Sequence, residues 1–442
     1  MSDLISARIL KGFRDFLPEA EIRRALLIEK LTEVFREAGF VPIDTPALEY
    51  SDVLLRKSGG ETEKQVFRFT DNGGRDVALR FDLTVPFARF VAEHYSQLYF
   101  PFKRYHIAKV WRGEKPQAGR FREFVQCDFD IVGSDAACTD FEILKLMRQS
   151  LKAIGVDKIL IHVSHRAIFN RFLTRLQLTE KSADVLRIVD KLAKVGEAQV
   201  LEELTALSDE ASAQKILSYI KGGVPAVKPE LFEQTLAYIE ELAGGPAADT
   251  EHMREIYRLI SALGINEFYV LDPSITRGLD YYTGVVFETF LTELPEIGSV
   301  CSGGRYDNLT GLYMKENISG TGASIGLDRL LAGLEQLGKI NKDEGFISAL
   351  VFCTGDADIA RNQQIAAYLT EHGIPCEVFP DPKKMAQQYT YAEKKHIPWG
   401  IFPETSAGSI EDQQITLKHL PTRAEEKIPL RLAQEKIKTK AQ

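Results

Sequence analysis

KRYHIAKVWRGEKPQAGRFREFVQCDFDIVG (Lys103–Gly133) is the stretch that decides the fold. β-branched and aromatic residues dominate its two arms, and Gly113, Pro116 and Gly119 punctuate the charged middle. This pattern predicts two strands joined by a loop. On the second arm apolar residues alternate with polar ones, and side chains of a strand point alternately to opposite faces. One face, predicted to face the core, carries Phe121, Val125, Cys127, Phe129 and Ile131.

The opposite face of this arm is polar and carries Arg122, Gln126, Asp128 and Asp130. The solvent-exposed face of an antiparallel sheet would account for such side chains. The residues around the loop favour a binding site instead: Arg112, Glu114, Lys115, Arg120 and Arg122. Guanidinium groups held in such a place suit an anionic ligand, since their planar fork binds phosphate or carboxylate through two hydrogen bonds.

The stretch resembles the second signature motif of class II aminoacyl-tRNA synthetases. Its sequence is similar in particular to the version of this motif in the histidyl-tRNA synthetase family. The resemblance implies an ATP-dependent enzyme that activates an amino acid on an antiparallel sheet.

The composition is that of an ordinary soluble protein. The chain has 442 residues, of which 44% are hydrophobic and 27% charged, and about two or three domains are usual for this length. Its 5 cysteines show no paired spacing, which favours a reducing compartment and argues against a zinc site. Without a long apolar run or a signal-like amino terminus, we expect a cytoplasmic protein that does not enter the membrane.

The net charge of -8 is unusual for a protein that binds nucleic acid. An enzyme needs only a local positive track, and the loop of the central hairpin is one candidate. The tail Lys427 to Lys440 is a second candidate, although a solvated end is the simpler interpretation.

Two segments before the central hairpin carry further signals. Apolar residues at helical spacing from Ile22 to Phe35, ended by Gly39, precede the extended segment FVPIDTPALEY (residues 40–50). This combination resembles the first class II motif, which builds the dimer interface in that family. A hairpin turn is predicted at residues 71–74.

The segment RFDLTVPFAR (residues 80–89) places Asp82 and Thr84 on one side of the chain. A helix start would explain this pattern, with Asp82 or Thr84 as the cap and Pro86 in the first turn. By resemblance, a segment of this kind also offers its carboxylate and hydroxyl to the α-ammonium group of histidine.

Helical and glycine-rich segments follow the hairpin. Residues 135–155 show a helical apolar stripe, KILIHV (residues 158–163) reads as a strand, and residues 165–264 form a largely helical block interrupted by glycine pairs. The block resembles an inserted domain that approaches the tRNA acceptor stem in the family.

Two signatures specific to the histidyl family follow the helical block. RGLDYYTG (residues 277–284) matches the first, and CSGGRYDNL (residues 301–309) resembles the second. Cys301 stands where a smaller residue is expected, and we expect this difference to affect pocket packing only. GTGASIGLDRLLAGLEQL (residues 320–337) resembles the third class II motif, whose arginine corresponds to Arg329 and reaches the γ-phosphate of ATP.

Beyond residue 345 strands and helices alternate, which is typical of a small parallel α/β domain. It resembles the anticodon-binding domain of the family. The predicted fold is therefore α+β: a class II catalytic domain (residues 1–164 and 265–336), a helical insertion (165–264) and an α/β anticodon-binding domain (346–442).

The resemblance implies histidine–tRNA ligase chemistry: ATP and L-histidine form histidyl-adenylate, and histidine passes to the 3′ end of tRNA(His). It implies a homodimer and Mg²⁺, for which no protein ligand is identified. The implied catalytic residues are Arg112 and Arg277, and the ATP-binding residues are Arg112, Glu114 and Arg329. The implied histidine-binding residues are Asp82, Thr84, Gln126, Asp130, Arg277, Tyr281, Tyr282 and Tyr306. Asp130 and Tyr282 would bracket the imidazole, which has one donor and one acceptor when neutral.

Two other classes of protein fit part of this pattern. A regulatory subunit of histidine biosynthesis that binds histidine without catalysis would lack both the anticodon-type domain and the RGLDYYTG stretch. A non-catalytic RNA-binding or signalling module would not need Arg112, Arg277 and Arg329 together. The three arginines and the carboxy-terminal pattern favour the enzyme.

Overall fold

The structure is a computed structural model and describes residues 4–55, 63–115, 119–275, 281–340, 345–354, 358–404 and 409–439. The chain divides into two compact units. The first comprises Met1–Asp15 and Leu26–Ile340, and the second comprises Phe16–Ala25 and Asn341–Gln442.

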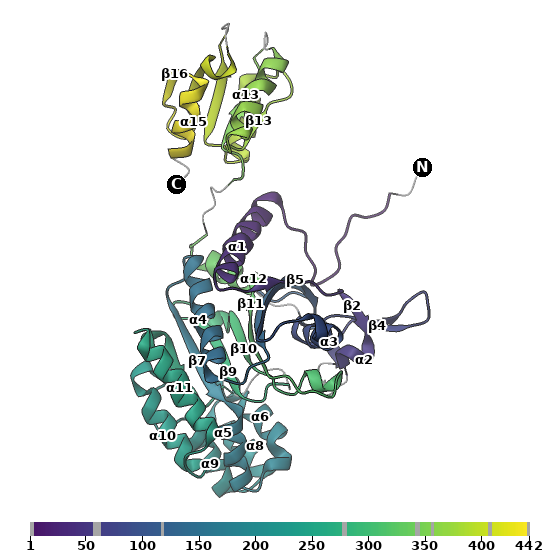
Figure 1. Ribbon diagram of the computed structural model, residues 1–442, viewed down its shortest axis with the longest axis vertical. Helices are drawn as coiled ribbons and strands as arrows, with labels where there is room; N and C mark the ends of the chain where they lie inside the picture. The colour runs from purple at the N-terminus through teal and green to yellow at the C-terminus, as the bar shows by residue number, and fades with distance from the viewer. Residues whose placement is uncertain are drawn as a thin grey trace. The chain divides into compact units, whose positions relative to one another are not determined.

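The first unit is built on an eight-stranded sheet (Figure 1). Across the sheet the strands are β1 (Val41–Pro42), β5 (Phe102–Trp111), β6 (Glu123–Val132), β11 (Gly320–Gly326), β10 (Cys301–Arg305), β9 (Val285–Leu291), β7 (Ile159–His165) and β8 (Tyr269–Leu271). Only the outer pairs, β1 with β5 and β7 with β8, are parallel. The sheet is therefore mainly antiparallel, as the sequence predicts.

The central hairpin is formed by β5 and β6, and it confirms the strongest prediction from the sequence. Its register places Arg104 opposite Asp130 and Ile107 opposite Cys127. Cys127, Phe129 and Ile131 have no exposed surface, and the ring of Phe35 lies 5.0 Å from that of Phe129 between centroids. The alternation of the second arm therefore does separate a core face from a polar face.

Three helices with apolar stripes pack on this core: α1 (Pro18–Glu37), α4 (Ala137–Ala153) and α12 (Leu327–Gln336). α1 and α4 were predicted from helical spacing. α1 is followed by Gly39, whose φ of +80° is a left-handed conformation that favours glycine. α4 contacts β11, and α12 contacts β6. The helices thus bury one face of the sheet and leave the polar face of β6 for other contacts.

A small antiparallel sheet adjoins the hairpin, with strand order β2 (Leu48–Tyr50), β4 (Asp76–Leu79) and β3 (Arg68–Thr70). The predicted turn joins β3 to β4, and Asp71 Oδ1 accepts hydrogen bonds from the backbone of Gly73 and Arg75, both at 2.9 Å. Two helices accompany this sheet, α2 (Ser51–Leu55) and α3 (Thr84–His94). Phe87 and Val91 of α3 are fully buried.

Between β7 and β8 the chain is helical, as predicted. The helices are α5 (Arg166–Arg175), α6 (Ser182–Val189), α7 (Leu192–Val195), α8 (Glu197–Leu207), α9 (Glu210–Ile220), α10 (Phe232–Leu242) and α11 (Ala248–Ala262). Gly223 has a φ of +64°, and a Cβ at this position would lie 2.5 Å from the ring of Tyr238. Buried side chains connect this block to the core of the sheet, so its status as a separate domain stays a prediction.

The second unit contains a five-stranded sheet with strand order β13 (Cys376–Val378), β12 (Ala349–Val351), β14 (Trp399–Pro403), β15 (Gln414–His419) and β16 (Glu425–Pro429). The helices that accompany it are α13 (Ile359–Glu371), α14 (Met385–Lys394) and α15 (Leu430–Thr439). β12 pairs with β13 and β14 in parallel, as predicted, but β14, β15 and β16 are antiparallel.

The interpretation of the tail Lys427 to Lys440 as a solvated end holds for the basic side chains that the structure describes, which are exposed, but the segment itself is folded. Its first residues belong to β16 and most of the rest to α15, where Leu430, Ala433 and Ile437 are buried. The basic side chains lie on the other face of an amphipathic helix, which is why charge alone is misleading here.

Short 3₁₀ helices connect these elements at Glu63–Gln65, Tyr95–Gln97, Thr179–Lys181, Pro229–Leu231, Asn266–Phe268, Pro295–Ile297, Thr310–Leu312 and Ile410–Asp412. Within the described ranges, none of the helices is long and apolar enough to cross a membrane.

Candidate active site

Two adjoining cavities open on the polar face of β6. One, the arginine cavity, has a volume of about 210 Å³ and is lined by Arg112, Glu114, Arg120, Ser299 and Arg329 among others. The other, the carboxylate cavity, has a volume of about 230 Å³ and is lined by Asp82, Thr84, Asp128, Asp130, Tyr281, Tyr282, Glu288 and Tyr306 among others. Their walls share Arg112, Gln126, Ser302 and Ser324. The two cavities therefore meet at Arg112 and Gln126.

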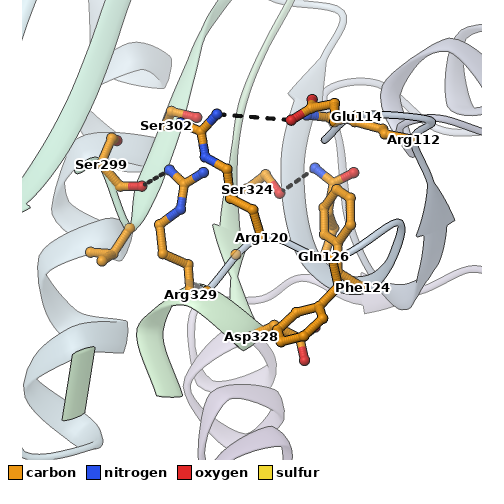
Figure 2. Close-up of a pocket in the computed structure, with 14 residues that line it drawn as sticks. Arg112, Glu114, Arg120, Phe124, Gln126, Ser299, Ser302, Ser324, Asp328 and Arg329 are labelled. Atoms are coloured by element: carbon orange, nitrogen blue, oxygen red, sulfur yellow. Dashed lines mark hydrogen bonds and ion pairs between the residues drawn. The ribbon is translucent and has the colours of Figure 1, made fainter. Parts of the chain in front are cut away.

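Guanidinium groups from two distant segments face the arginine cavity (Figure 2). Arg329, in the first turn of α12, donates a hydrogen bond from Nη1 to the carbonyl of Ser299 at 2.7 Å. Arg120, in the loop before β6, lies 3.8 Å from Glu114. α12 is fixed against β6 because Asp328 accepts a hydrogen bond from the backbone of Val125 at 2.7 Å.

The electrostatics of this cavity favour an anion. Burial, followed by the positive charges of Arg120 and Arg112, lowers the pKa of Arg329 to about 10. The guanidinium stays protonated at neutral pH, and it lies among like charges that Glu114 and Glu288 partly offset. A bound phosphate chain would relieve this repulsion.

Arg112 lies where the two cavities meet, just beyond the end of β5. Its Nε donates a hydrogen bond to the carbonyl of Phe81 at 2.9 Å, and its guanidinium lies 5.2 Å from the ring centre of Phe124. Its backbone N–H donates to the carbonyl of Arg122 at 2.9 Å. The side chain is thus held in place before any ligand binds.

Asp82 enters the carboxylate cavity from the start of α3. Its Oδ1 accepts a hydrogen bond from the backbone of Val85 at 3.1 Å, and the Tyr281 hydroxyl donates to its Oδ2 at 3.2 Å. Burial raises the pKa of Asp82 to about 6. The N-cap residue of α3 is Leu83, and Asp82, one residue earlier, supplies the side-chain acceptor for the first turn. This carboxylate is 1% exposed and also lines the cavity.

Asp130 is held from two sides. Its Oδ1 accepts a hydrogen bond from the Tyr306 hydroxyl at 2.6 Å, and its Oδ2 lies 2.8 Å from Nη2 of Arg104. Arg104 is fully buried and lies against Phe87, 4.2 Å from its ring centre. Burial raises the pKa of Asp130, and Arg104 followed by Tyr306 opposes that shift. Asp130 is 2% exposed, so the solvated-face interpretation of this strand does not hold.

Tyr306 is positioned by the residue before it. Arg305 of β10 donates from Nε and Nη2 to Asp140 Oδ2 at 3.0 and 2.8 Å, and His252 of α11 contacts the same oxygen at 2.6 Å. This buried network ties β10 to α4 and α11. The hydroxyl of Tyr306 is therefore aimed at Asp130 from a fixed backbone.

Glycines form the floor of the carboxylate cavity on β10 and β11. A Cβ at Gly322 would lie 2.0 Å from Asp130 Oδ1, and a Cβ at Gly303 would lie 2.1 Å from the carbonyl oxygen of Gly322. Both glycines line this cavity. The absence of side chains therefore makes room for the carboxylate and for the cavity above it.

We expect Gly322→Ala to lower the melting temperature and to weaken binding of the ligand of this cavity. The added methyl group overlaps with Asp130, and overpacking of this kind costs about 1–3 kcal/mol. Gly326→Ala on the same strand is the matched control for stability, because its Cβ would meet nothing nearer than 3.9 Å. Calorimetry of both variants checks this, and equal melting temperatures would contradict it.

Comparison with known proteins agrees with this geometry. The model of the family described as histidyl-tRNA synthetase matches residues 12–330. The chain belongs to the histidyl-tRNA synthetase family.

Relatives in this family match along nearly the whole chain. The histidine–tRNA ligase of Treponema denticola is 62% identical over 99% of this chain and 99% of its own. That of Rhodopirellula baltica is 46% identical over 94% of this chain and 95% of its own. The crystal structure of histidyl-tRNA synthetase from Nostoc sp. PCC 7120 is similar with a TM-score of 0.85 at 27% identity, covering 99% of this chain and 100% of that one.

The residues predicted for the synthetase site are largely brought together. The carboxylate cavity is lined by Asp82, Thr84, Gln126, Asp130, Tyr281, Tyr282 and Tyr306, and the arginine cavity by Arg112, Glu114 and Arg329. Arg277 lies outside the described residues. The individual roles of all these residues stay predictions. Cys301 is buried in the core cluster and lines neither cavity, so its packing role concerns the core and not the pocket.

The sequence interpretation did not assign three charged residues that matter to the site: Arg104, Arg120 and Asp128. Arg120 was placed in the cationic loop without a role. Period-two alternation placed Asp128 on the polar face with Gln126 and Asp130, but no role was assigned to it. Arg104 could have been found only from the register of the hairpin, which places it opposite Asp130.

Proposed function

We propose that this chain is a histidine–tRNA ligase that works in two steps. Histidine attacks the α-phosphate of ATP, which gives histidyl-adenylate and pyrophosphate, and histidine then passes to the 3′ end of tRNA(His). The observation that carries the proposal is the junction of a cationic and an anionic cavity at Arg112. An amino acid and a triphosphate bound side by side need this arrangement.

ATP would occupy the arginine cavity. Arg112 and Arg277 would flank the α-phosphate, Arg329 would hold the γ-phosphate, and Glu114 would approach the adenine. Phosphoryl transfer depends mainly on in-line positioning and on cations that face the developing charge. The repulsion between Arg329, Arg120 and Arg112 supports this placement.

Histidine would occupy the carboxylate cavity. Asp82 and Thr84 would bind its α-ammonium group, with Tyr281 holding Asp82 in place. Asp130, Tyr282 and Tyr306 would lie around the imidazole, and Gln126 would complete the pocket. Polar groups left unpaired by an apolar amino acid would reject it by a factor of about 10⁴ or more.

Mg²⁺ would accompany ATP. Within the described part of the chain no group of three or more metal-ligating side chains could hold a metal ion by itself. That fits Mg²⁺, which is usually bound by substrate phosphates together with one or two carboxylates. Glu288 is the carboxylate that would hold it, since it lines the carboxylate cavity and its charge acts on Arg329. The ion would neutralise charge on the phosphates.

The remaining assignments concern partners. The helices of residues 165–264 would approach the tRNA acceptor stem, and the domain of residues 346–442 would bind the anticodon. A homodimer in the cytoplasm is proposed, and apolar side chains on the small sheet support an interface there: Leu48, Tyr50 and Phe69 are 39%, 53% and 47% exposed.

Exchange of radiolabelled pyrophosphate into ATP tests the function. We expect exchange that requires histidine and is lost in Arg277→Ala, whose unchanged melting temperature would show that the fold survives. Arg258→Ala is the matched control, because this arginine is exposed and pairs only with Glu255 among described residues. Equal exchange with another amino acid would refute the specificity, and histidine binding without exchange would favour the regulatory alternative.

A further inference from the structure

Asp128 lies in the carboxylate cavity but has no assigned role. It lies on β6 between Gln126 and Asp130, opposite Ser324 of β11 and His106 of β5. It lines the cavity and is 2% exposed. Its Oδ1 has no hydrogen-bond partner among the described residues. A buried carboxylate oxygen without a partner is costly unless a ligand supplies one.

Asp130 differs from Asp128 in this respect. Its Oδ1 is occupied by the Tyr306 hydroxyl at 2.6 Å, and its Oδ2 lies 2.8 Å from Arg104. Arg104 forms no such ion pair with Asp128 in the described structure. Gln126 Oε1 on the same face also has no hydrogen-bond partner among the described residues, but it is a neutral acceptor. Asp128 therefore supplies the carboxylate oxygen on this face of β6 that has neither a hydrogen bond nor an ion pair among the described residues.

The charges around the cavity point the same way. Arg104 offsets Asp130, and the α-ammonium group of the amino acid would offset Asp82. Asp128 is left without a cation of its own. A ligand that binds here therefore has to supply, besides its α-ammonium group, a second nitrogen that carries a proton. The imidazole of histidine is such a group, since both ring nitrogens are donors when it is protonated.

We propose that Asp128 is a further specificity-determining residue, whose free Oδ1 accepts a hydrogen bond from a ring N–H of histidine bound as the imidazolium. The inference rests on the proposed function and adds one carboxylate to the residues that the family resemblance assigns. One proton is shared between the carboxyl and the ring. The pocket thus selects the side chain by charge as well as by shape.

Other titratable and charged groups face Asp128 from the surrounding elements: Arg80, Asp82, Arg104, His106, Arg112, Asp130, Tyr281, Tyr282, Glu288, Cys301 and Tyr306. Burial lowers the pKa of His106 to about 4, so His106 stays neutral in a neutral assay. The pKa of Asp82 is raised to about 6, and it affects only the acidic limb. Burial raises the pKa of the Tyr281, Tyr282 and Tyr306 hydroxyls and of the Cys301 thiol above their ordinary values.

The alkaline limb of the pH profile therefore reports on Asp128 and the ligand. Burial raises the pKa of Asp128 to about 7, opposed by Arg104, and a free imidazole titrates near about 6.5. At a pH above both pKa values, the Asp128 carboxyl and the imidazole of free histidine are deprotonated. Binding of histidine as the imidazolium then takes up one proton from solution. We expect the KM for histidine in pyrophosphate exchange to rise by up to about tenfold per pH unit above pH ~7.5.

The wild-type protein provides the first test. 3-(4-Thiazolyl)alanine keeps the α-ammonium group and has no ring N–H, so its inhibition constant measures the rest of the pocket. Between pH 7.5 and 8.5 the KM for histidine should rise while this constant rises far less. Parallel profiles would overturn the inference. Absence of histidine-dependent exchange would instead refute the proposed function.

Asp128→Asn provides the second test, because the amide keeps the shape and removes the charge. We expect the KM for histidine to rise about 10- to 100-fold, the alkaline limb to flatten, and the inhibition constant of the thiazole analogue to change less than about threefold. Equal weakening of both compounds, or no change for histidine, would overturn the inference. If this variant does not fold, the wild-type profiles decide.

Discussion

Replacing Arg112 by alanine is expected to lower the kcat of histidine-dependent pyrophosphate exchange by about 10²- to 10³-fold. Arg112 lines both cavities, and its guanidinium is held by the carbonyl of Phe81 at 2.9 Å. A donor that is already in place stabilises the transition state without reorganisation, which is worth about 3 kcal/mol. Steady-state exchange kinetics at saturating histidine and ATP measure this loss.

Arg112→Lys separates charge from geometry. Lysine keeps one positive charge and loses the planar fork that binds two phosphate oxygens, so we expect a loss between those of the wild type and Arg112→Ala. Arg187, exposed and paired with Asp184 one turn earlier on α6, supplies the control. A kcat for Arg112→Ala within about threefold of that of Arg187→Ala would show that Arg112 has no role in the reaction.

Arg104→Ala is expected to reduce stability and histidine binding together. The side chain of Arg104 is fully buried and that of Asp130 is 3% exposed, with 2.8 Å between Nη2 and Oδ2. Removing one partner of a buried ion pair leaves an uncompensated charge and costs about 3–5 kcal/mol. The melting temperature should fall, and the KM for histidine should rise by at least about 100-fold because Asp130 is then misplaced or neutralised.

The double variant Arg104→Met with Asp130→Asn distinguishes the two effects. It removes both charges, and replacing a buried ion pair by neutral groups is often neutral for stability. We expect the melting temperature to recover while histidine binding stays weak. Additive effects of the two substitutions in a double-mutant cycle would show that the pair is not coupled.

The elements that could be predicted are those with local signals. The hairpin of residues 103–133 follows from alternation and turn residues, and the helix capped near Asp82 follows from the sequence around Pro86. The family resemblance supplied the site residues. Those among them that the structure describes line one or both of the two adjoining cavities. Each of these signals lies within a short stretch of chain.

What could not be predicted depends on pairing between distant strands. The burial of Asp128 and Asp130 results from β11 and from the segments around Asp82 and Tyr281, which cover the polar face of β6. The alternation of apolar and polar residues is the same whether the polar face is exposed to solvent or forms the wall of a cavity. In the second unit, the antiparallel pairing of β14, β15 and β16 likewise has no local signal that separates it from a parallel arrangement.

The glycine floor limits how the selectivity of this pocket can change. At Gly303 and Gly322 any larger residue takes volume away, because the main chain or Asp130 is already within 3 Å of the missing Cβ. Mutation of the floor can therefore only shrink the space. Space for a bulkier amino acid has to be created at the rim of the pocket, where tyrosines can be replaced by smaller residues. Directed evolution of this enzyme toward larger substrates should therefore accumulate its substitutions there.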